Sequence, residues 1–227
     1  MTDQELEGAI AVALGQPDNL GKPGLLALRA RLQAERAPDD PSLGKLGDAL
    51  VELAARTPGN LADLLAWSEE RARWLAAARG PAHPETIIAW GELAATADLE
   101  CAWGAAIRAW EAIVASPIDL DHGDPAMHAH VSLALRGLGA RCLATGQVDE
   151  ARRWFARDLA LRERMHPRPE PQLAISLGNL AGALERLGER SQALAARRRE
   201  RDVLVATGAS RGQLDSVDRH IAALAAP

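Results

Sequence analysis

The sequence is poor in aromatic residues, cysteine and lysine. Of its 227 residues none is tyrosine, one is phenylalanine and six are tryptophan. Alanine and leucine supply most of the apolar content, and they favour helices, whereas the β-branched and aromatic residues that favour strands are few. The composition therefore predicts helices rather than strands.

Two further deficits concern cysteine and long apolar runs. Cys101 and Cys142 are the only cysteines, and both fall in patterns typical of amphipathic helix, where a thiol packs like a small apolar group. The apolar stretch Ala9–Leu14 follows an acidic start and lacks the length and basic flank of a signal or membrane segment. We therefore expect no disulfide and no membrane association, and we predict a cytoplasmic protein.

Motifs of the common enzyme classes are also missing. Gly8, Gly15, Gly21 and Gly24 have neither the spacing of a phosphate-binding loop nor the Lys-Ser/Thr that follows one. The chain contains no His-Glu-x-x-His, the motif of zinc proteases. Its one Gly-x-Ser-x-Gly, at Gly208–Gly212, follows no strand pattern and so does not form the strand–turn–helix elbow of serine hydrolases. We predict that the protein is not an enzyme and has neither catalytic residues nor a cofactor.

One metal-like cluster lies between residues 119 and 130. It combines three aspartates with His122, His128 and His130. Asp124 and His128 are four apart, the spacing that can place two ligands on one helix face. No thiolate or second ligand pair joins them, and connections between helices are commonly polar, so we predict no metal site.

Internal repeats organise the chain. Proline follows a polar or acidic residue at four places, each before a run of apolar residues with helical spacing, and the separations are 43, 41 and 46 residues. Proline at the first position of a helix loses only a donor that would lack a partner anyway. The prolines therefore predict four helix starts, at Pro41, Pro84, Pro125 and Pro171.

Each repeat reads as two helices joined by a tight turn. The last repeat places leucines at steps of four, three, four and three from Leu173 to Leu187, which is one helix face. Gly146 and Gly188 follow such faces and suit the left-handed conformation that ends a helix. The tryptophan pairs Trp67/Trp74 and Trp103/Trp110 are seven apart, so we interpret them as core.

The last two repeats resemble the tetratricopeptide repeat of the kinesin-light-chain type. The residues that carry the resemblance are Ser176–Ala181, Leu184, Leu187-Gly188 and Ala193-Leu194, preceded by Leu138-Gly139, Gly146, Asp149–Ala151, Trp154-Phe155 and Leu161–Pro167. The fit extends less closely over residues 40–124, where Trp90 stands at a small position and Pro58–Asn60 replaces the turn. The family's usual tyrosines are absent.

The resemblance implies an all-α, right-handed solenoid of about four helix-turn-helix repeats. We assign residues 1–39 to an N-terminal cap or degenerate repeat with helices near 3–14 and 20–36. The array covers 40–207, with repeats near 40–82, 83–123, 124–169 and 170–207. Residues 208–227 form a capping helix that places Leu214, Val217, Ile221 and Leu224 on one face.

In this family the first helices line a groove that receives a partner segment. By resemblance the groove positions are Asn179, Arg136, Gly178, Gly182, Ile175, Arg186, Ile87, Ile88, Gly91 and Val51. Small residues in the groove make room for an apolar ligand or a helix, and Asn179 and Arg136 can bond a peptide backbone or a carboxylate. An equally weighted reading is that the glycines only permit close helix packing.

Charge is divided unevenly along the chain. Residues 1–135 carry 10 basic and 20 acidic residues, whereas residues 136–227 carry 16 and 11. Arginine supplies 24 of the 26 basic residues, which with the alanine content favours a GC-rich bacterial genome. The arginines near 152–157 and 197–201 form a candidate nucleic-acid surface, but acidic residues interrupt them and no aromatic cluster is present for stacking.

These observations predict a non-catalytic protein–protein interaction scaffold or regulatory subunit that binds a peptide or helix of a partner. An alternative is a receptor for a small ligand or signalling peptide, and a weaker one is nucleic-acid binding through the arginine-bearing helices. Self-association is also open, because the two halves differ in charge sign.

Overall fold

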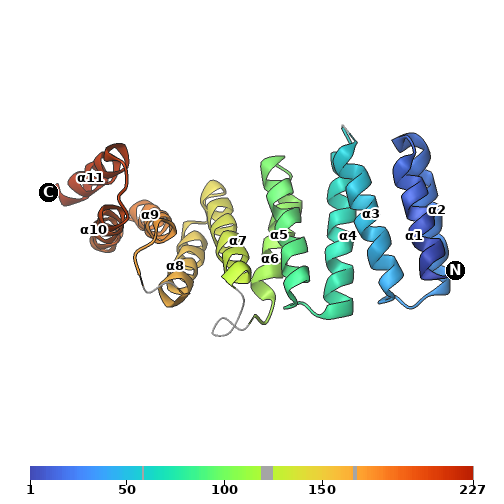
Figure 1. Ribbon diagram of the computed structural model, residues 1–227. Helices are drawn as coiled ribbons and strands as arrows, with labels where there is room; N and C mark the ends of the chain where they lie inside the picture. Colours follow the sequence, from blue (N-terminus) through green and yellow to red (C-terminus); the bar gives the residue numbers. More distant parts are fainter. Residues whose placement is uncertain (58, 119–124, 166–167, 227) are drawn as a thin grey trace. The chain divides into compact units, whose positions relative to one another are not determined.

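The computed structural model describes residues 1–57, 59–118, 125–165 and 168–226. Over these residues it contains eleven α-helices and no strand (Figure 1). The helices are α1 (Asp3–Gly15), α2 (Asp18–Glu35), α3 (Pro41–Arg56), α4 (Leu61–Arg79), α5 (Pro84–Leu99), α6 (Trp103–Ala115), α7 (Pro125–Ala144), α8 (Val148–Met165), α9 (Pro171–Arg186), α10 (Arg190–Ala206) and α11 (Arg211–Ala225). The all-helical prediction is confirmed. None of the described helices combines the length and apolarity needed to cross a membrane.

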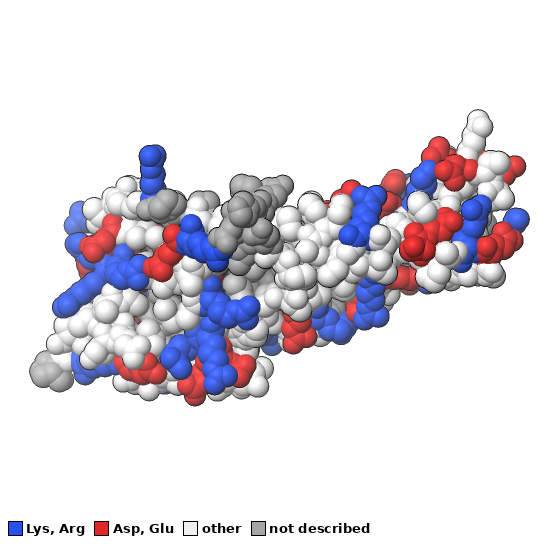
Figure 2. All heavy atoms as spheres, turned by 90° about the horizontal axis from the view of Figure 1, so that it is seen from below, with Lys and Arg blue, Asp and Glu red and all other residues white. Residues whose placement is uncertain are grey.

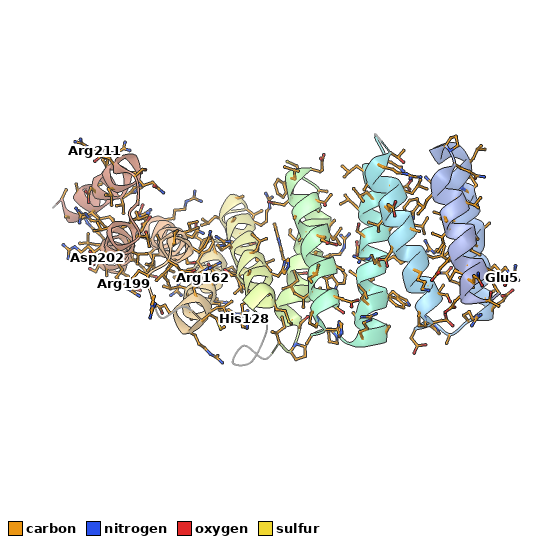
Figure 3. The ribbon with its side chains drawn as sticks, in the orientation of Figure 1. Glu5, His128, Arg162, Arg199, Asp202 and Arg211 are labelled. Atoms are coloured by element: carbon orange, nitrogen blue, oxygen red, sulfur yellow. The ribbon has the colours of Figure 1, made fainter. Side chains whose placement is uncertain are left out.

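The helix starts agree with the sequence. Proline begins α3, α5, α7 and α9, as predicted. The Asp40 carboxylate accepts a hydrogen bond from the Ser42 amide at 2.9 Å, which satisfies one of the free donors at the start of α3. The outermost helices α1 and α11 each begin with a reciprocal capping box, in which Glu5 (Figure 3) and Gln213 reach back to the preceding cap residue.

Four helix ends share one backbone motif. The amide of Gln147 donates to the Cys142 carbonyl at 2.8 Å, and three equivalent bonds occur after α5, α9 and α10. The motif requires one left-handed residue, and glycine supplies it at Gly146, Gly188 and Gly208. After α5 the left-handed residue is Cys101, with φ 57°. The prediction that Cys101 lies within a helix is therefore wrong, since the residue occupies an exposed turn.

The chain divides into two compact units, residues 1–130 and 131–227, and the boundary in the sequence falls within α7. In unit 1 the core includes Leu25, Leu46 and Leu50 from α2 and α3. In unit 2 it includes Phe155, Leu177 and Leu184 from α8 and α9. Unit 1 carries 10 basic and 20 acidic residues, and unit 2 carries 16 basic and 11 acidic residues. These are the same counts as for residues 1–135 and 136–227, because residues 131–135 are uncharged.

Glycines on first helices accept bulky side chains from second helices. A Cβ atom on Gly44 of α3 would overlap the ring of Trp74 on α4, and one on Gly139 of α7 would overlap the ring of Phe155 on α8. Such contacts let paired helices approach closely. The core interpretation of the paired tryptophans holds for Trp67 and Trp110, which are buried. Trp74 and Trp103 are only half-buried.

Candidate binding cleft

A cleft of about 470 Å³ opens between α9, α10 and α11 in unit 2. Its apolar lining residues are Pro171, Ala174, Ile175, Leu204, Ala209 and Val217, and its polar lining residues are Arg197, Glu200, Thr207, Gln213, Ser216 and His220. Arg197 and Glu200, both on α10, are called the charged wall below. Ile175 is 44% exposed and offers aliphatic surface to the cleft. The cleft thus combines apolar surface with a few charged groups, the usual composition of a ligand site.

Three predicted groove residues lie on the α9 face that meets this charged wall. Ile175, Gly178 and Gly182 are spaced three and four residues apart and share one helix face. An added Cβ on Gly178 would lie 2.8 Å from the Glu200 Oε1 atom, and one on Gly182 would lie 4.0 Å from the Arg197 Nη2 atom. The glycines therefore let the side chains of α10 lie directly against α9.

Arg197 joins two carboxylates at this wall. Its Nε donates to Glu185 Oε1 at 2.7 Å, and its Nη1 donates to Glu200 Oε2 at 2.9 Å. Burial by itself would lower the pKa of Arg197, but the hydrogen bonds to Glu185 and Glu200 outweigh burial and raise its pKa. The Arg197 side chain is 11% exposed and that of Glu200 is 15% exposed. The pair is therefore largely shielded from water.

The helix α11, which closes one side of the cleft, is attached by polar contacts as well as by packing. Arg190 Nε donates to the Leu224 carbonyl at 2.6 Å, where it caps the end of α11. Arg201 pairs with Asp218 at 2.6 Å. His220 Nδ1 lies 3.4 Å from Glu185 Oε2. The predicted apolar face of α11 is confirmed, with Val217 buried and its other members partly buried.

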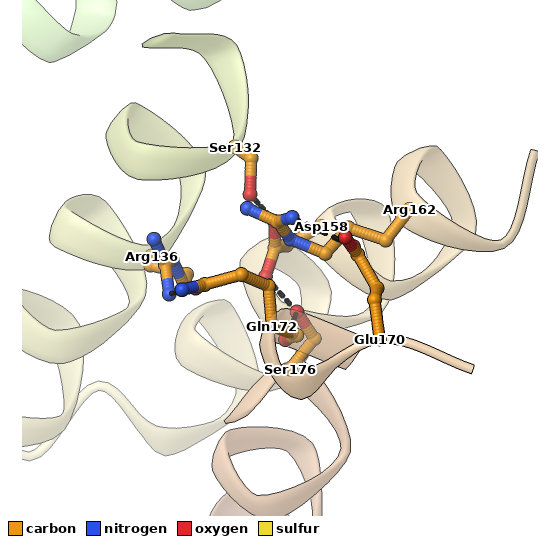
Figure 4. Close-up of polar contacts among 7 residues, drawn as sticks. All are labelled: Ser132, Arg136, Asp158, Arg162, Glu170, Gln172 and Ser176. Atoms are coloured by element: carbon orange, nitrogen blue, oxygen red, sulfur yellow. Dashed lines mark hydrogen bonds and ion pairs between the residues drawn. The ribbon is translucent and has the colours of Figure 1, made fainter. Parts of the chain in front are cut away.

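A buried polar cluster lies beside the cleft and joins α7, α8 and α9 (Figure 4). Asp158 of α8 has no exposed surface and accepts hydrogen bonds from the hydroxyls of Ser132 and Ser176, the latter at 2.6 Å. Arg162 lies 3.9 Å from Asp158 and pairs with Glu170 at 3.0 Å. The cluster fixes α9, and with it one wall of the cleft.

Sequence reasoning missed Asp158, although a signal for it exists. The apolar stripe of α8 includes Phe155 and Leu159. Asp158 and Arg162 fall at helical spacing on the same stripe. Placing them on the buried face would have predicted partners on neighbouring helices, because buried charges need them. The serine partners follow only from the way α7 and α9 pack on α8.

The predicted groove residue Arg136 belongs to this cluster and does not line the cleft. Its Nη1 donates to Gln172 Oε1 at 3.1 Å. Burial lowers the pKa of Arg136, the negative charge of Asp158 opposes that shift, and the positive charge of Arg162 adds to it. Arg136 therefore connects the start of α9 to α7, and its substitution would perturb packing as well as any binding surface.

The remaining predicted groove residues have varied environments. In unit 2, Asn179 is half-buried and Arg186 is exposed, with its Nη1 donating to the Leu143 carbonyl at 3.3 Å. In unit 1, Ile87 has no exposed surface, Ile88 is 38% exposed and Val51 packs partly buried on the core. A Cβ on Gly91 would overlap the His130 ring. Of the predicted groove residues, Ile175 thus lines the unit 2 cleft, while Gly178 and Gly182 lie on the same face of α9 beside Glu200 and Arg197.

The described parts of the chain contain no group of histidine, cysteine or acidic residues that could hold a metal ion. His128 is buried on α7 (Figure 3) and His130 contacts Gly91. His122 and the aspartates at 119, 121 and 124 lie outside the described residues.

Arginines of the proposed nucleic-acid surface are partly neutralised. Arg153 pairs with Glu150 at 3.2 Å, Arg199 pairs with Glu163, and Arg201 pairs with Asp218. Figure 2 shows acidic side chains interspersed among the basic ones on the face in view. This pattern is typical of a solvated surface rather than of a phosphate-binding track.

A second cleft, of about 450 Å³, lies between α2, α3 and α4 in unit 1 and includes Trp67 and Trp74. Its charged residues are paired with one another or with neighbours: Arg29 lies 2.7 Å from Glu70, and Arg71 lies 3.3 Å from Glu92. The wall is therefore electrically balanced and indicates no particular ligand charge.

Comparisons with solved structures identify the fold. No family model and no curated protein matches the sequence. A putative kinesin light chain from Podosopora anserina with nearly identical TPR-like repeats is similar at a TM-score of 0.51 and 19% identity, over 88% of this chain and 93% of that one. BtubC (BKLC) from P. vanneervenii gives a TM-score of 0.51 and 18% identity, over 89% of this chain and 88% of that one. The chain thus has the TPR-like helical-repeat fold expected from the resemblance.

Proposed function

We propose that this protein is a non-catalytic interaction scaffold whose cleft between α9, α10 and α11 holds a segment of a partner protein. The carrying observation is the exposed Ile175 in a cleft that also contains Arg197 and Glu200, whose side chains lie against the glycines of α9. Tetratricopeptide-like folds generally serve protein–protein interaction, which supports the proposal by analogy. A cleft of about 470 Å³ accommodates a few side chains of such a segment.

The cleft favours an extended segment with an apolar anchor. Ile175 and Leu204 offer aliphatic surface, while Gln213 and Ser216 offer side-chain donors and acceptors within the same cleft. A peptide backbone carries donors and acceptors at every residue and suits such a mixed surface. Arg197, locked between two carboxylates, contributes a rigid wall rather than a mobile binding group.

The test uses an exposed apolar residue of the cleft and one of equal exposure elsewhere. Tagged wild-type protein, Ile175→Asp and Leu133→Asp are purified from the native cells, and bound proteins are quantified by mass spectrometry. Ile175 is 44% exposed and Leu133 is 43% exposed, and both lie in unit 2. We expect Ile175→Asp alone to lose a stoichiometric partner.

Three other outcomes would count against the proposed cleft or change the proposed ligand. A partner that both variants retain would contradict the proposed cleft. A partner that both variants lose would show general damage to unit 2 and would also remove support for the cleft. If no protein is captured but a small molecule copurifies with the wild type and is lost with Ile175→Asp, the receptor alternative replaces the scaffold.

A further inference from the structure

We propose that the unit 2 cleft selects a partner segment with an isolated lysine or arginine, whose charged end pairs with Glu200 and whose aliphatic stem lies on Ile175 and Leu204. This inference rests on the proposed function, because it specifies the ligand of the same cleft. Three features carry it: an imbalance of charge, a carboxylate oxygen without a hydrogen-bond donor, and apolar residues that line the same cleft.

Counted together with Glu185, which contacts Arg197 but does not line the cleft, the charged residues include more carboxylates than permanent cations. Arg197 is shared between Glu185 and Glu200, so one guanidinium faces two carboxylates. His220 lies 3.4 Å from Glu185 and adds positive charge only when protonated. With His220 neutral, this group of four side chains carries one unbalanced negative charge. Partial burial makes such a charge costly, and a cation supplied by a ligand would offset the cost.

One carboxylate oxygen is placed to receive that cation. Glu200 Oε2 accepts from Arg197, whereas no donor among the described residues bonds to Glu200 Oε1. Oε1 lies against α9 at Gly178, 2.8 Å from where a Cβ would be, and Glu200 lines the cleft. A lysine ammonium or an arginine guanidinium that reached this oxygen would form a charge-assisted hydrogen bond.

The rest of the cleft suits the stem of a basic side chain. Lysine and arginine carry three or four methylene groups that pack on apolar surface while the charged end seeks a polar partner. Ile175, Leu204 and Val217 line the cleft together with Glu200. A neutral aliphatic side chain would gain the same apolar contact but would leave the excess negative charge uncompensated.

An anionic ligand fits this wall poorly. Both sides of the Arg197 guanidinium are engaged, so an incoming carboxylate or phosphate would have to displace Glu185 or Glu200. Unit 2 carries a net charge of +5, from 16 basic and 11 acidic residues. That distant charge is screened beyond about 8 Å at physiological salt, but it disfavours a highly basic tract. An isolated basic residue in a mixed segment is therefore the expected ligand.

The experiment measures ligand charge directly. Full-length ¹⁵N-labelled protein is titrated with Nα-acetyl-lysine methylamide, with its uncharged isostere Nα-acetyl-norleucine methylamide and with Nα-acetyl-glutamate methylamide. Amide shifts are followed for residues 174–182 and 197–204. We expect saturable shifts with the lysine compound, binding about tenfold weaker for the norleucine compound and no saturation for the glutamate compound.

Two variants separate recognition of charge from general damage. Glu200→Gln keeps the shape of the side chain and should weaken lysine binding about tenfold without changing norleucine binding. Glu163→Gln removes an exposed carboxylate on α8 and should leave both unchanged. Equal binding of lysine and norleucine, tighter binding of glutamate, or unchanged lysine binding by Glu200→Gln would each overturn the inference.

The two proposals fail in different ways. If Ile175→Asp loses the cellular partner but the lysine compound binds no better than norleucine, the scaffold stands and charge selection is wrong. If the lysine compound binds through Glu200 but Ile175→Asp loses no partner, the cleft recognises cations without acting as the protein interface.

Discussion

The carboxylate of Asp158, buried without exposed surface in α8, accepts a hydrogen bond from the hydroxyl of Ser176 on α9 at 2.6 Å. Because Ser132 on α7 donates to the same carboxylate, three helices meet at one charged group. A buried charge is tolerated only when its partners are in place. Asp158 therefore makes the relative placement of α7, α8 and α9 specific in a way that apolar packing alone does not.

We expect Asp158→Ala to lower the free energy of unfolding by about 3 kcal/mol, because it removes the acceptor that the Ser132 and Ser176 hydroxyls share and the buried negative charge beside Arg162. Asp158→Asn should cost less, since the amide oxygen still accepts one hydroxyl bond. Urea unfolding followed by circular dichroism measures both values. The exposed Asp202 (Figure 3) provides a control, whose change to alanine should stay within about 0.5 kcal/mol. Wild-type stability in Asp158→Ala would contradict the role assigned to the cluster.

Alanine should have opposite effects at two helical glycines. A Cβ on Gly139 would overlap the Phe155 ring, so Gly139→Ala should destabilise unit 2 by about 1–3 kcal/mol. Gly212 on α11 has open space around its Cβ position, so Gly212→Ala should stabilise by about 0.5–1 kcal/mol through helix propensity. Thermal and urea unfolding of the two variants checks both signs. A stabilised Gly139→Ala would show that Phe155 can move aside.

The two cysteines should differ in reactivity. Burial raises the pKa of the Cys142 thiol, and the negative charge of Glu150 adds to the rise. A raised pKa leaves less thiolate at a given pH, so the reactive form of Cys142 accumulates only under more alkaline conditions. Cys101 is exposed. We expect iodoacetamide at pH 8 to modify Cys101 about tenfold faster, as measured by peptide mass spectrometry. Equal rates would require unit 2 to open readily around Cys142.

Acid should remove a stabilising ion pair in unit 1. The hydrogen bond from Arg108 lowers the pKa of Glu69 below its ordinary value of 4.5; burial opposes this, and the charges of Arg108 and Arg73 reinforce it. A lowered folded-state pKa stabilises above pH 4.5 and loses that contribution as pH falls through the folded-state value. Glu69→Gln should therefore cost about 1 kcal/mol at pH 7 and progressively less below pH 4.5, in urea unfolding. A cost independent of pH would exclude the ion pair as its source.

Local signals in the sequence determine much of the fold. Proline at the first helical position and glycine in left-handed turns act within a few residues, so the starts of α3, α5, α7 and α9 follow from sequence. Cys101 escapes this reasoning because the turn motif needs only a left-handed residue, and here a non-glycine residue takes that conformation.

The sequence predicted the α9 side of the cleft but not the α10 side. Resemblance to the repeat family placed Ile175, Gly178 and Gly182 in the predicted groove, and their spacing puts them on one face of α9. It could not place Arg197 and Glu200 against that face, since their approach depends on how α10 packs on α9. Ile87 was predicted to line the groove, but it is fully buried. Helical periodicity does not distinguish a groove residue from a core residue when both flanks of a helix are covered.

The unequal division of charge between the units has a consequence for solubility. Unit 1 carries −10 and unit 2 carries +5 with histidine neutral. At the isoelectric point, near pH 5.7, the total charge of the chain is zero, but the two units still carry charges of opposite sign. Copies of the protein then attract through opposite patches while their overall repulsion vanishes. Moderate salt screens that attraction, and the protein should dissolve better in about 0.3 M sodium chloride than in dilute buffer at this pH.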